Sequence, residues 1–244
     1  MRLSARLEAV LGLIPRGYPL LDVGCDHAFL SVEAVRRGIC PCAVASDIGR
    51  GPLRSAAAHI REAGLSDLAA PVLADGIPGD WRERTAELLG IPEEEVPAPA
   101  AVTAGMGGML MTDIYRRAAD FPETISVCVA SPQRDADLFR RFLVSGGLWI
   151  EAETFVEEDG KFYPVIRAVF KPGERQMLLP AEEKYGPLIL KERSPAFLRY
   201  LTGRRLELSR ALSCVPEDKT RRREEIGSEL RVIESVLDGE RMQG

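Results

Sequence analysis

One short turn, between an apolar run and a helical stretch, contains Asp22, Gly24, Cys25, Asp26 and His27. A buried strand, a turn with a glycine and a helix N-terminus together form the unit that binds nucleotide cofactors in many α/β proteins. The turn has one glycine where a dinucleotide-binding turn has three, and Asp26 would repel a pyrophosphate. A cofactor with a cationic centre, such as the sulfonium of S-adenosylmethionine (SAM), would tolerate this aspartate. The alternative interpretation is an ordinary strand-to-helix turn.

Further acidic residues stand at the ends of the next two predicted strands. Asp47 ends a strand predicted over residues 43–48, where Ile48 follows it. An acid at this position accepts hydrogen bonds from the ribose hydroxyls of an adenosine cofactor; alternatively, Asp47 caps the next helix. A third strand, predicted over residues 71–76, ends in Asp75-Gly76, where the adenine would lie.

A glycine-rich turn follows the fourth predicted strand, residues 100–104, and consists of Gly105-Met106-Gly107-Gly108. Three glycines in four residues leave room for a flat ligand above bare backbone. A tight turn is the alternative, but one glycine would suffice for it. A fifth strand, predicted over residues 125–130, ends in Ser131-Pro132-Gln133.

Helical patterns alternate with these strands, and a hairpin follows them. The helical patterns cover residues 3–14, 52–63, 109–119 and 136–143, and two strands over residues 149–156 and 162–170 are joined by an Asp-Gly turn. This order predicts an α/β fold, a doubly wound Rossmann-like sheet whose last strand runs antiparallel. The methyltransferase version of the fold ends in such a hairpin, whereas an ordinary dinucleotide fold does not. All candidate residues then fall at the C-terminal edge of the sheet, where cofactor and substrate bind.

A change of composition divides the chain into a predicted SAM-binding domain, residues 1–175, and a helical domain, residues 176–244. Apolar residues at positions 226, 230, 233 and 237 have the spacing of paired, coiled-coil-like helices, and a second apolar face runs from position 201 to 215. Arginines off these faces form either a solvated surface or a strip that contacts phosphates: Arg204, Arg205, Arg221, Arg222 and Arg223.

The bulk composition is that of an ordinary globular protein, with 244 residues, 45% hydrophobic, and a net charge of −5. This charge gives no global signature of nucleic-acid binding, so an RNA partner would contact a local basic patch. The five cysteines form no metal-binding pattern, and we expect them to be reduced in a cytoplasmic protein. We expect no metal and no membrane partner, and a monomer is favoured.

Several stretches occur in the order found in one protein family. They are Leu3-Ser4-Ala5-Arg6-Leu7, Asp22 to Leu30, Thr103 to Gly108, Glu157 to Tyr163 and Gly186-Pro187-Leu188. On these residues, and nearly from end to end, the sequence resembles the bacterial tRNA methyltransferases that modify N1 of the adenine at tRNA position 22. The resemblance implies a SAM-dependent Rossmann-like domain and a coiled-coil-like domain that helps to hold tRNA.

The resemblance also implies which candidates contact each end of SAM. Arg6, Asp22 and Gly24 would surround the methionine end, and Asp47 would bind the ribose. Asp75-Gly76 would lie with Asp47 at the adenosine end, and the remaining candidates for cofactor contacts are Cys25, Asp26, His27, Ile48 and Gly105.

The same edge of the sheet would present the target base. Asp26 would stabilise the positive charge of the methylated adenine or accept the proton lost from its amine. His27 would orient the cofactor or the base, or cap a helix. Phe29 and Pro132 are candidates for stacking on a flipped base. The predicted catalytic set is completed by Met106, Gly107 and Gln133.

The sequence departs from the family pattern at a few of these positions. Phe29 replaces Tyr, Ser31 replaces Pro, Asp47 and Pro164 replace Glu, and Ser131-Pro132-Gln133 replaces Gln-Pro-Asn, in the segment expected to face the base. The hypothesis is methyl transfer to N1 of adenine 22. The alternatives are a SAM methyltransferase for a different RNA position or a small molecule, and a non-catalytic RNA-binding module that retains the fold.

Overall fold

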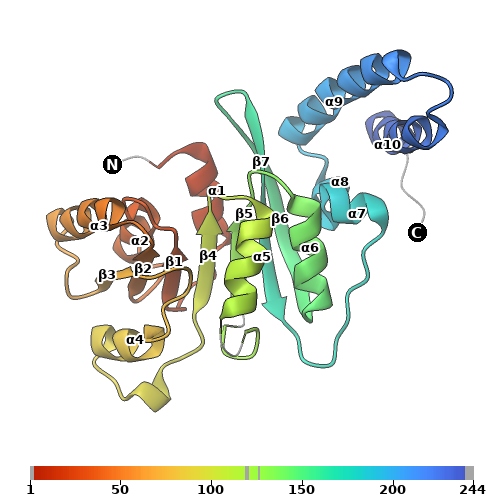
Figure 1. Cartoon of the computed structure of the whole chain (residues 1–244). Helices are drawn as coiled ribbons and strands as arrows, with labels where there is room; N and C mark the ends of the chain where they lie inside the picture. Colours follow the sequence, from red (N-terminus) through yellow and green to blue (C-terminus); the bar gives the residue numbers. More distant parts are fainter. Residues whose placement is uncertain (1–2, 119–120, 126, 240–244) are drawn as a thin grey trace.

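The computed structural model describes residues 3–118, 121–125 and 127–239. Its centre is a seven-stranded sheet with the order β3-β2-β1-β4-β5-β7-β6 (Figure 1). The strands are β1 (Leu20–Val23), β2 (Ala43–Asp47), β3 (Ala69–Leu73), β4 (Ala100–Ala104), β5 (Val127–Ser131), β6 (Leu148–Glu158) and β7 (Lys161–Phe170). Strands β1 to β5 run parallel, and β7 lies antiparallel between β5 and β6. The predicted Rossmann-like α/β fold is confirmed.

The sequence of the strands reflects their surroundings. All residues of β1 and β5 are buried, as expected for parallel strands that are covered on both faces. The turn between β6 and β7 consists of Asp159 and Gly160, whose φ angles are 50° and 71°. Positive φ at both central residues is the requirement of a type I′ hairpin turn, which favours Asp-Gly. The predicted hairpin is therefore confirmed.

Helices cover both faces of the sheet. One apolar cluster is shared by α1 (Ala5–Leu13), α2 (Phe29–Arg36) and α3 (Arg50–Glu62). The other cluster is shared by α4 (Trp81–Leu89), α5 (Gly108–Arg117) and α6 (Ala136–Ser145), and a short 3-10 helix, η1 (Glu93–Glu95), follows α4. Helix α3 begins two residues earlier than the predicted helix over residues 52–63. Ala119, the last residue of the helix predicted over 109–119, and Ser126, in the strand predicted over 125–130, lie outside the described residues.

The third strand differs from its prediction. It covers Ala69–Leu73 rather than residues 71–76, because its pairing with β2 ends where Leu73 lies opposite Asp47. The next backbone N–H, that of Ala74, still donates to the carbonyl oxygen of Asp47 at 3.1 Å. Asp75-Gly76 therefore lies in the loop beyond the strand.

Four helices follow the sheet: α7 (Pro180–Tyr185), α8 (Pro187–Glu192), α9 (Pro195–Cys214) and α10 (Thr220–Asp238). Helices α9 and α10 pack against each other at the blue end of the chain (Figure 1). Their shared core contains Leu201, Leu208, Ile226, Leu230 and Ile233. Val236 is fully buried in this core, and Leu237, the predicted position, packs at its edge. The domain boundary at residue 175 stays a prediction.

A buried ion pair joins the sheet to these helices. Arg140 of α6 donates from Nε to Oε1 of Glu153 on β6 at 2.8 Å, and the two side chains are 1% and 0% exposed. Nη1 of Arg140 also donates to two backbone carbonyl oxygens of α7 at 3.1 Å each, and Glu153 accepts from the N–H of Leu188 at 3.0 Å. A Cβ at Gly186, between α7 and α8, would lie 2.5 Å from Glu153 Oε1. Glycine is therefore required beside the pair.

Two observations hold for the described part of the chain. None of its helices combines the length and the apolar character needed to cross a bilayer. It also contains no cluster of three or more His, Cys, Asp or Glu side chains that could hold a metal ion. The five cysteines are free, and Cys214 alone among them is exposed.

Replacing Arg140 tests the ion pair. Because Arg140→Met leaves the Glu153 carboxylate buried without its partner, we expect the free energy of unfolding to fall by about 3–5 kcal/mol. Arg140→Met/Glu153→Leu should recover part of this loss, since it removes the buried charge as well. Urea denaturation followed by circular dichroism measures both changes.

The matched control is Arg141→Met. This neighbouring arginine is 57% exposed and pairs with Glu183, so its loss should cost at most about 1 kcal/mol. Equal, small losses for Arg140→Met and Arg141→Met would contradict the structural role of the buried pair.

Candidate functional site

A pocket of about 410 Å³ lies at the C-terminal edge of the parallel strands. It is bounded by the loops that follow β1, β2, β4 and β5 and by the first turn of α1. The lining brings together many of the sequence candidates and a few apolar neighbours: Arg6, Leu7, Asp22, Gly24, Cys25, Asp26, Phe29, Leu30, Asp47, Ala104, Gly105 and Gln133.

The turn after β1 has a tightly bent backbone. Gly24 (φ 73°), Asp26 (φ 51°) and Ala28 (φ 55°) adopt left-handed conformations, which cost non-glycine residues about 1–3 kcal/mol each. The N–H groups of Gly24 and the following residue donate to the carbonyl oxygen of Ser46 at 2.9 Å each, and so tie the turn to β2. A Cβ at Gly24 would lie 2.7 Å from Cε of Met106. A larger residue at position 24 would therefore displace the side chain of Met106, which lies outside the described lining of the pocket.

Asp47 connects the ends of β1 and β2. Its Oδ2 accepts from the N–H of Asp26 at 3.2 Å, and its Oδ1 accepts from the N–H of Gly49 at 2.8 Å. A carboxylate has about four lone-pair sites, so Asp47 retains lone pairs for a ligand hydroxyl. Ile48 is 72% exposed and offers an apolar surface beside this acid.

Asp22 is more deeply buried than the other acids of the lining. Its Oδ2 accepts a 2.6 Å hydrogen bond from Ser31 Oγ. Burial raises the pKa of Asp22 from 3.8 to about 6, and the Ser31 hydrogen bond opposes this rise. At neutral pH the carboxylate is ionised but poorly solvated, so it favours a cationic ligand group.

Arg6 provides a buried donor at the pocket wall. Its Nη1 would lie 3.4 Å from a Cβ at Gly105, and its guanidinium carbon is 5.1 Å from the ring centroid of Tyr163. Its Nε lies 3.7 Å from Oε2 of Glu158, too far for a hydrogen bond. Within the described residues, Nε and Nη1 are buried and lack a hydrogen-bond partner. Arg6 is thus within ion-pair distance of Glu158 but has two guanidinium nitrogens without a hydrogen-bond acceptor, and such donors at a pocket wall favour an anionic ligand.

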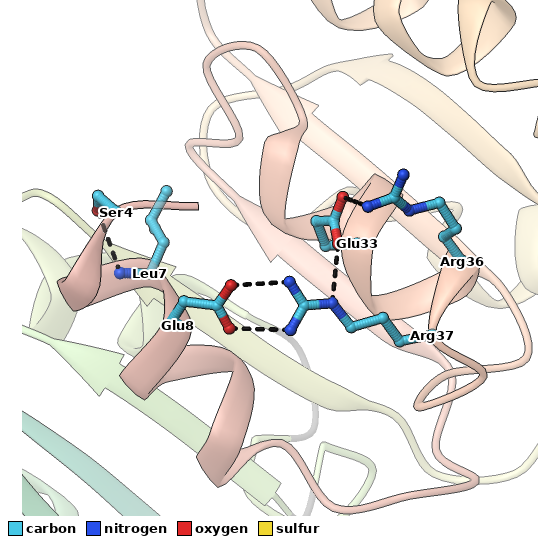
Figure 2. Close-up of polar contacts among 6 residues, drawn as sticks. All are labelled: Ser4, Leu7, Glu8, Glu33, Arg36 and Arg37. Carbon is cyan, nitrogen blue, oxygen red and sulfur yellow. Dashed lines mark hydrogen bonds and ion pairs between the residues drawn. The ribbon is translucent and has the colours of Figure 1, made fainter. Parts of the chain in front are cut away.

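Figure 2 shows how α1, which carries Arg6, is fixed against α2. Arg37 donates from Nη1 and Nη2 to the two carboxylate oxygens of Glu8 at 2.9 and 2.7 Å, and from Nε to Glu33 at 2.8 Å. Glu33 also pairs with Arg36. Ser4 caps the first turn of α1. The position of Arg6 therefore depends on a helix that is held at both its first turn and its outer face.

His27 and Phe29 stack on each other, with ring centroids 5.3 Å apart. Nε2 of His27 lies 3.6 Å from Oδ1 of Asp26, whose side chain is 71% exposed. Among the described residues, Phe29 and Asp26 line the pocket and His27 does not. If His27 contributes to binding or catalysis, it would do so by positioning Asp26 and Phe29.

Asp75 is engaged by a partner outside the pocket. Arg117 of α5 donates to its two carboxylate oxygens at 2.7 and 3.1 Å, and these hydrogen bonds lower the pKa of Asp75. The carbonyl oxygen of Gly76 accepts from Ser46 Oγ at 2.9 Å. Neither residue belongs to the described lining of the pocket. Their contact with a cofactor, like that of Ile48, stays a prediction.

The glycine-rich turn after β4 is less open than predicted. A Cβ at Gly107 would lie 2.9 Å from Nε of Arg134, and a Cβ at Gly108 would lie 2.2 Å from the carbonyl oxygen of Asp135. These two glycines permit close packing against the loop after β5. The prediction of bare backbone is therefore wrong at Gly108, and at Gly107 the exposed Arg134 side chain covers the backbone.

The loop after β5 also differs from its prediction. Ser131 is the last residue of β5 and is fully buried, so the expectation that it faces a base is wrong. Pro132 is buried as well, and it lies outside the described lining of this pocket. Gln133 is exposed and lines the pocket, and its N–H donates to the carbonyl oxygen of Met106 at 3.0 Å.

The arginines of the predicted basic strip differ in how strongly they are engaged by other groups of the protein. Arg223 donates to the carbonyl oxygens of Leu212 and Val215 at 3.2 and 2.7 Å, and so caps the end of α9. Arg204 pairs with two glutamates, at 3.1 and 3.2 Å. The side chains of Arg221 and Arg222 are largely exposed and share Glu225. tRNA contacts by these arginines and Arg205 stay a prediction.

Sequence reasoning did not select Glu158 and Tyr163 as site residues. It used the hairpin to predict the antiparallel last strand and as a family motif, and assigned its residues no role in the site. The pairing of β7 with β5 carries the hairpin tip past the C-terminal edge of the sheet, to Arg6. The signal was present, since this stretch is one of the family motifs. Leu7, Leu30 and Ala104 were missed because apolar periodicity does not distinguish a pocket wall from the core.

A larger cavity, of about 890 Å³, lies at the opposite edge of the sheet, beneath residues 171–178. Its position follows from the pairing of Val127 with Val169, which places the end of β7 at the start of β5. Ligands of open α/β sheets bind at the carboxyl ends of the strands. The smaller pocket is therefore the candidate active site.

The sequence profile of the methyltransferase-domain family matches residues 3–166. This match, the sheet with its antiparallel β7 and the pocket at the strand ends define the class: a Rossmann-like methyltransferase.

Comparison with individual proteins narrows the family. The tRNA (adenine(22)-N(1))-methyltransferase of Bacillus subtilis is 27% identical over 98% of each chain, and the crystal structure of the B. subtilis enzyme TrmK has a TM-score of 0.78 at 26% identity, covering 97% of this chain and 99% of that one. Streptococcus pneumoniae Sp1610, provisionally assigned as a tRNA (m1A22) methyltransferase, is 30% identical over 97% of this chain and 100% of its own, with a TM-score of 0.84; it has also been solved in complex with SAM. The chain belongs to this family of bacterial tRNA (adenine(22)-N(1))-methyltransferases.

Two glycine substitutions test the geometry of the turn. Gly24→Ala forces a Cβ against Met106 at positive φ, so we expect the free energy of unfolding to fall by about 1–2 kcal/mol. Gly12→Ala is the control, because it lies in α1 with open space around it and should raise stability by up to about 1 kcal/mol. Thermal unfolding distinguishes the two, and an equally stabilising Gly24→Ala would contradict the described turn.

Proposed function

We propose that this protein transfers a methyl group from SAM to N1 of the adenine at position 22 of tRNA. The observation that carries the proposal is the Arg6 guanidinium, which lines the pocket with a buried Nη1 and no hydrogen-bond partner among the described residues. The carboxylate of SAM fits this donor, and its ammonium group fits the buried carboxylate of Asp22. The similarity to the B. subtilis enzyme over nearly the full length supports the same substrate.

The other half of the pocket suits the nucleoside end of SAM. Asp47 has lone pairs for the ribose hydroxyls, and the exposed Ile48 offers an apolar face for adenine. Gly24 lets the backbone approach the cofactor closely. Bound there, SAM supplies an electrophilic methyl group on its sulfonium centre.

The contribution of the chain itself is position and the exclusion of water. Neutral adenine carries a lone pair on N1, so no strong base is required before transfer. Holding two reactants in a productive geometry supplies about 7–11 kcal/mol. Asp26, at the pocket rim, would stabilise the charge of the methylated base or accept the amine proton. We place this activity in the cytoplasm and expect a monomer.

The direct test is incubation of an unmodified tRNA transcript with the protein and labelled SAM. We expect one labelled nucleoside, 1-methyladenosine, in the digest, and a reverse-transcription stop at position 22, because the methyl group blocks the pairing edge. A transcript with guanine at position 22 is the control and should remain unlabelled. Label at another position would support a different RNA site, and SAM binding without any label would contradict the proposed activity.

The raised pKa of Asp22 predicts a pH-dependent affinity for SAM. Below about pH 6 the carboxyl group is protonated and no longer attracts the ammonium group, so Kd should rise by up to about tenfold per pH unit between pH 6 and 5. Isothermal titration calorimetry from pH 8 to 5 measures this change. Asp22→Asn should bind weakly with a flat profile, and Ser31→Ala, which removes the hydrogen bond that lowers the pKa, should move the midpoint upward. A flat wild-type profile would exclude Asp22 from this role.

A further inference from the structure

A further cavity, of about 260 Å³, lies between the sheet and the C-terminal helices. Its walls are the loop after β5, the β6–β7 hairpin, and parts of α7 and α9. Gln133 lines both this cavity and the cofactor pocket. The two spaces therefore adjoin each other across one exposed side chain.

Four aromatic side chains line this cavity: Tyr185, which is buried in the core of the helical part, and three half-buried rings, those of Phe155, Phe162 and Tyr200. The ring centroids of Phe155 and Phe162 are 6.0 Å apart, and that of Tyr200 lies 5.3 and 5.5 Å from them. Phe197, which also contacts Phe155, is fully buried in the core of the helical part. Core packing accounts for Phe197, whereas the three half-buried rings border open space.

Charged side chains surround the aromatic wall. Arg134 is 82% exposed and lies 3.7 Å from the carboxylate of Asp135. Asp137 and Lys184 also line the cavity, and Nζ of Lys184 pairs with Glu229 at 2.6 Å. Ring faces that stack on a base, carboxylates that accept from its amine and cations that contact phosphates are the combination that binds unstacked nucleotides.

We propose that this cavity binds one unstacked nucleotide of the tRNA, adjacent in the chain to the target adenine. The proposal rests on the proposed function, because it requires the target base to reach the adjoining cofactor pocket. The N1 atom of the target adenine must reach the methyl group inside the cofactor pocket, whereas the Gln133 side chain separates this cavity from that pocket. A neighbouring nucleotide therefore fits it, and contacts to flanking nucleotides govern substrate choice in enzymes that flip bases.

Leucine substitutions test the stacking wall. Phe162→Leu and Tyr200→Leu keep apolar bulk and remove the ring, so we expect the Kd for tRNA to rise about tenfold or more. Phe162→Tyr and Tyr200→Phe retain the ring and should stay within about twofold of wild type. Leu206→Ala, at an exposed position of α9 outside the cavity, is the surface control. Calorimetry with SAM alone should give the wild-type Kd for every variant, which shows that each is folded.

A fluorescent base locates the bound nucleotide. 2-Aminopurine is placed one position before, one position after, or at position 22 of the transcript. Binding to the wild-type protein should change the fluorescence at one flanking position, and Tyr200→Leu should abolish that change.

Either of two results would overturn the proposal: leucine variants that bind tRNA with the wild-type Kd, or a response to Tyr200→Leu confined to the reporter at position 22. Failure of the proposed function has a separate signature, because the wild-type protein would then add no methyl group to any transcript.

Discussion

The buried pair of Arg140 and Glu153 determines where the C-terminal helices lie relative to the sheet. Both charges are removed from water, and that cost is offset only because each is fully hydrogen-bonded, to the other and to the backbone of α7 and α8. Glycine at position 186 is part of the same constraint. With α7 and α8 fixed in this way, α9 meets the hairpin, and Tyr200 comes to face Phe155 and Phe162. The aromatic cavity beside the cofactor pocket therefore depends on the Arg140–Glu153 ion pair and on the glycine at position 186.

The cofactor pocket depends on elements that are distant in sequence. The turn after β1 and the acids after β1 and β2 are local products of the strand–helix units. Arg6 instead arrives from α1, which is held by the Glu8–Arg37 contact on one side and by the hairpin residues Glu158 and Tyr163 on the other. The anionic end of the ligand is therefore met by a group whose position reflects the packing of three separate segments.

Features that depend on local sequence could be predicted, whereas features that depend on contacts between distant segments could not. The alternation of strands and helices, the hairpin and the placement of Asp22, Gly24 and Asp47 at one edge follow from local patterns, and the structure agrees with them. The part of the glycine-rich turn covered by Arg134 and Asp135 could not be predicted, because those contacts come from the loop after another strand. Likewise, Arg204 and Arg223 look like free surface charges in the sequence, but the structure gives them Glu229 and the end of α9 as partners. Family motifs identify the hairpin residues as important, and only tertiary structure connects them to Arg6.

The central claim is that a sulfonium-bearing nucleoside lies across Gly24 with its amino-acid end at Arg6. A crystal structure with S-adenosylhomocysteine, which retains the amino-acid, ribose and adenine groups but has a neutral thioether in place of the sulfonium, tests this placement most directly. The account predicts that the ligand carboxylate accepts from Nη1 of Arg6, that its ammonium group faces Asp22 and that its ribose hydroxyls bind Asp47. A ligand bound in the cavity beneath residues 171–178, or in the pocket with Arg6 still lacking a partner, would contradict it.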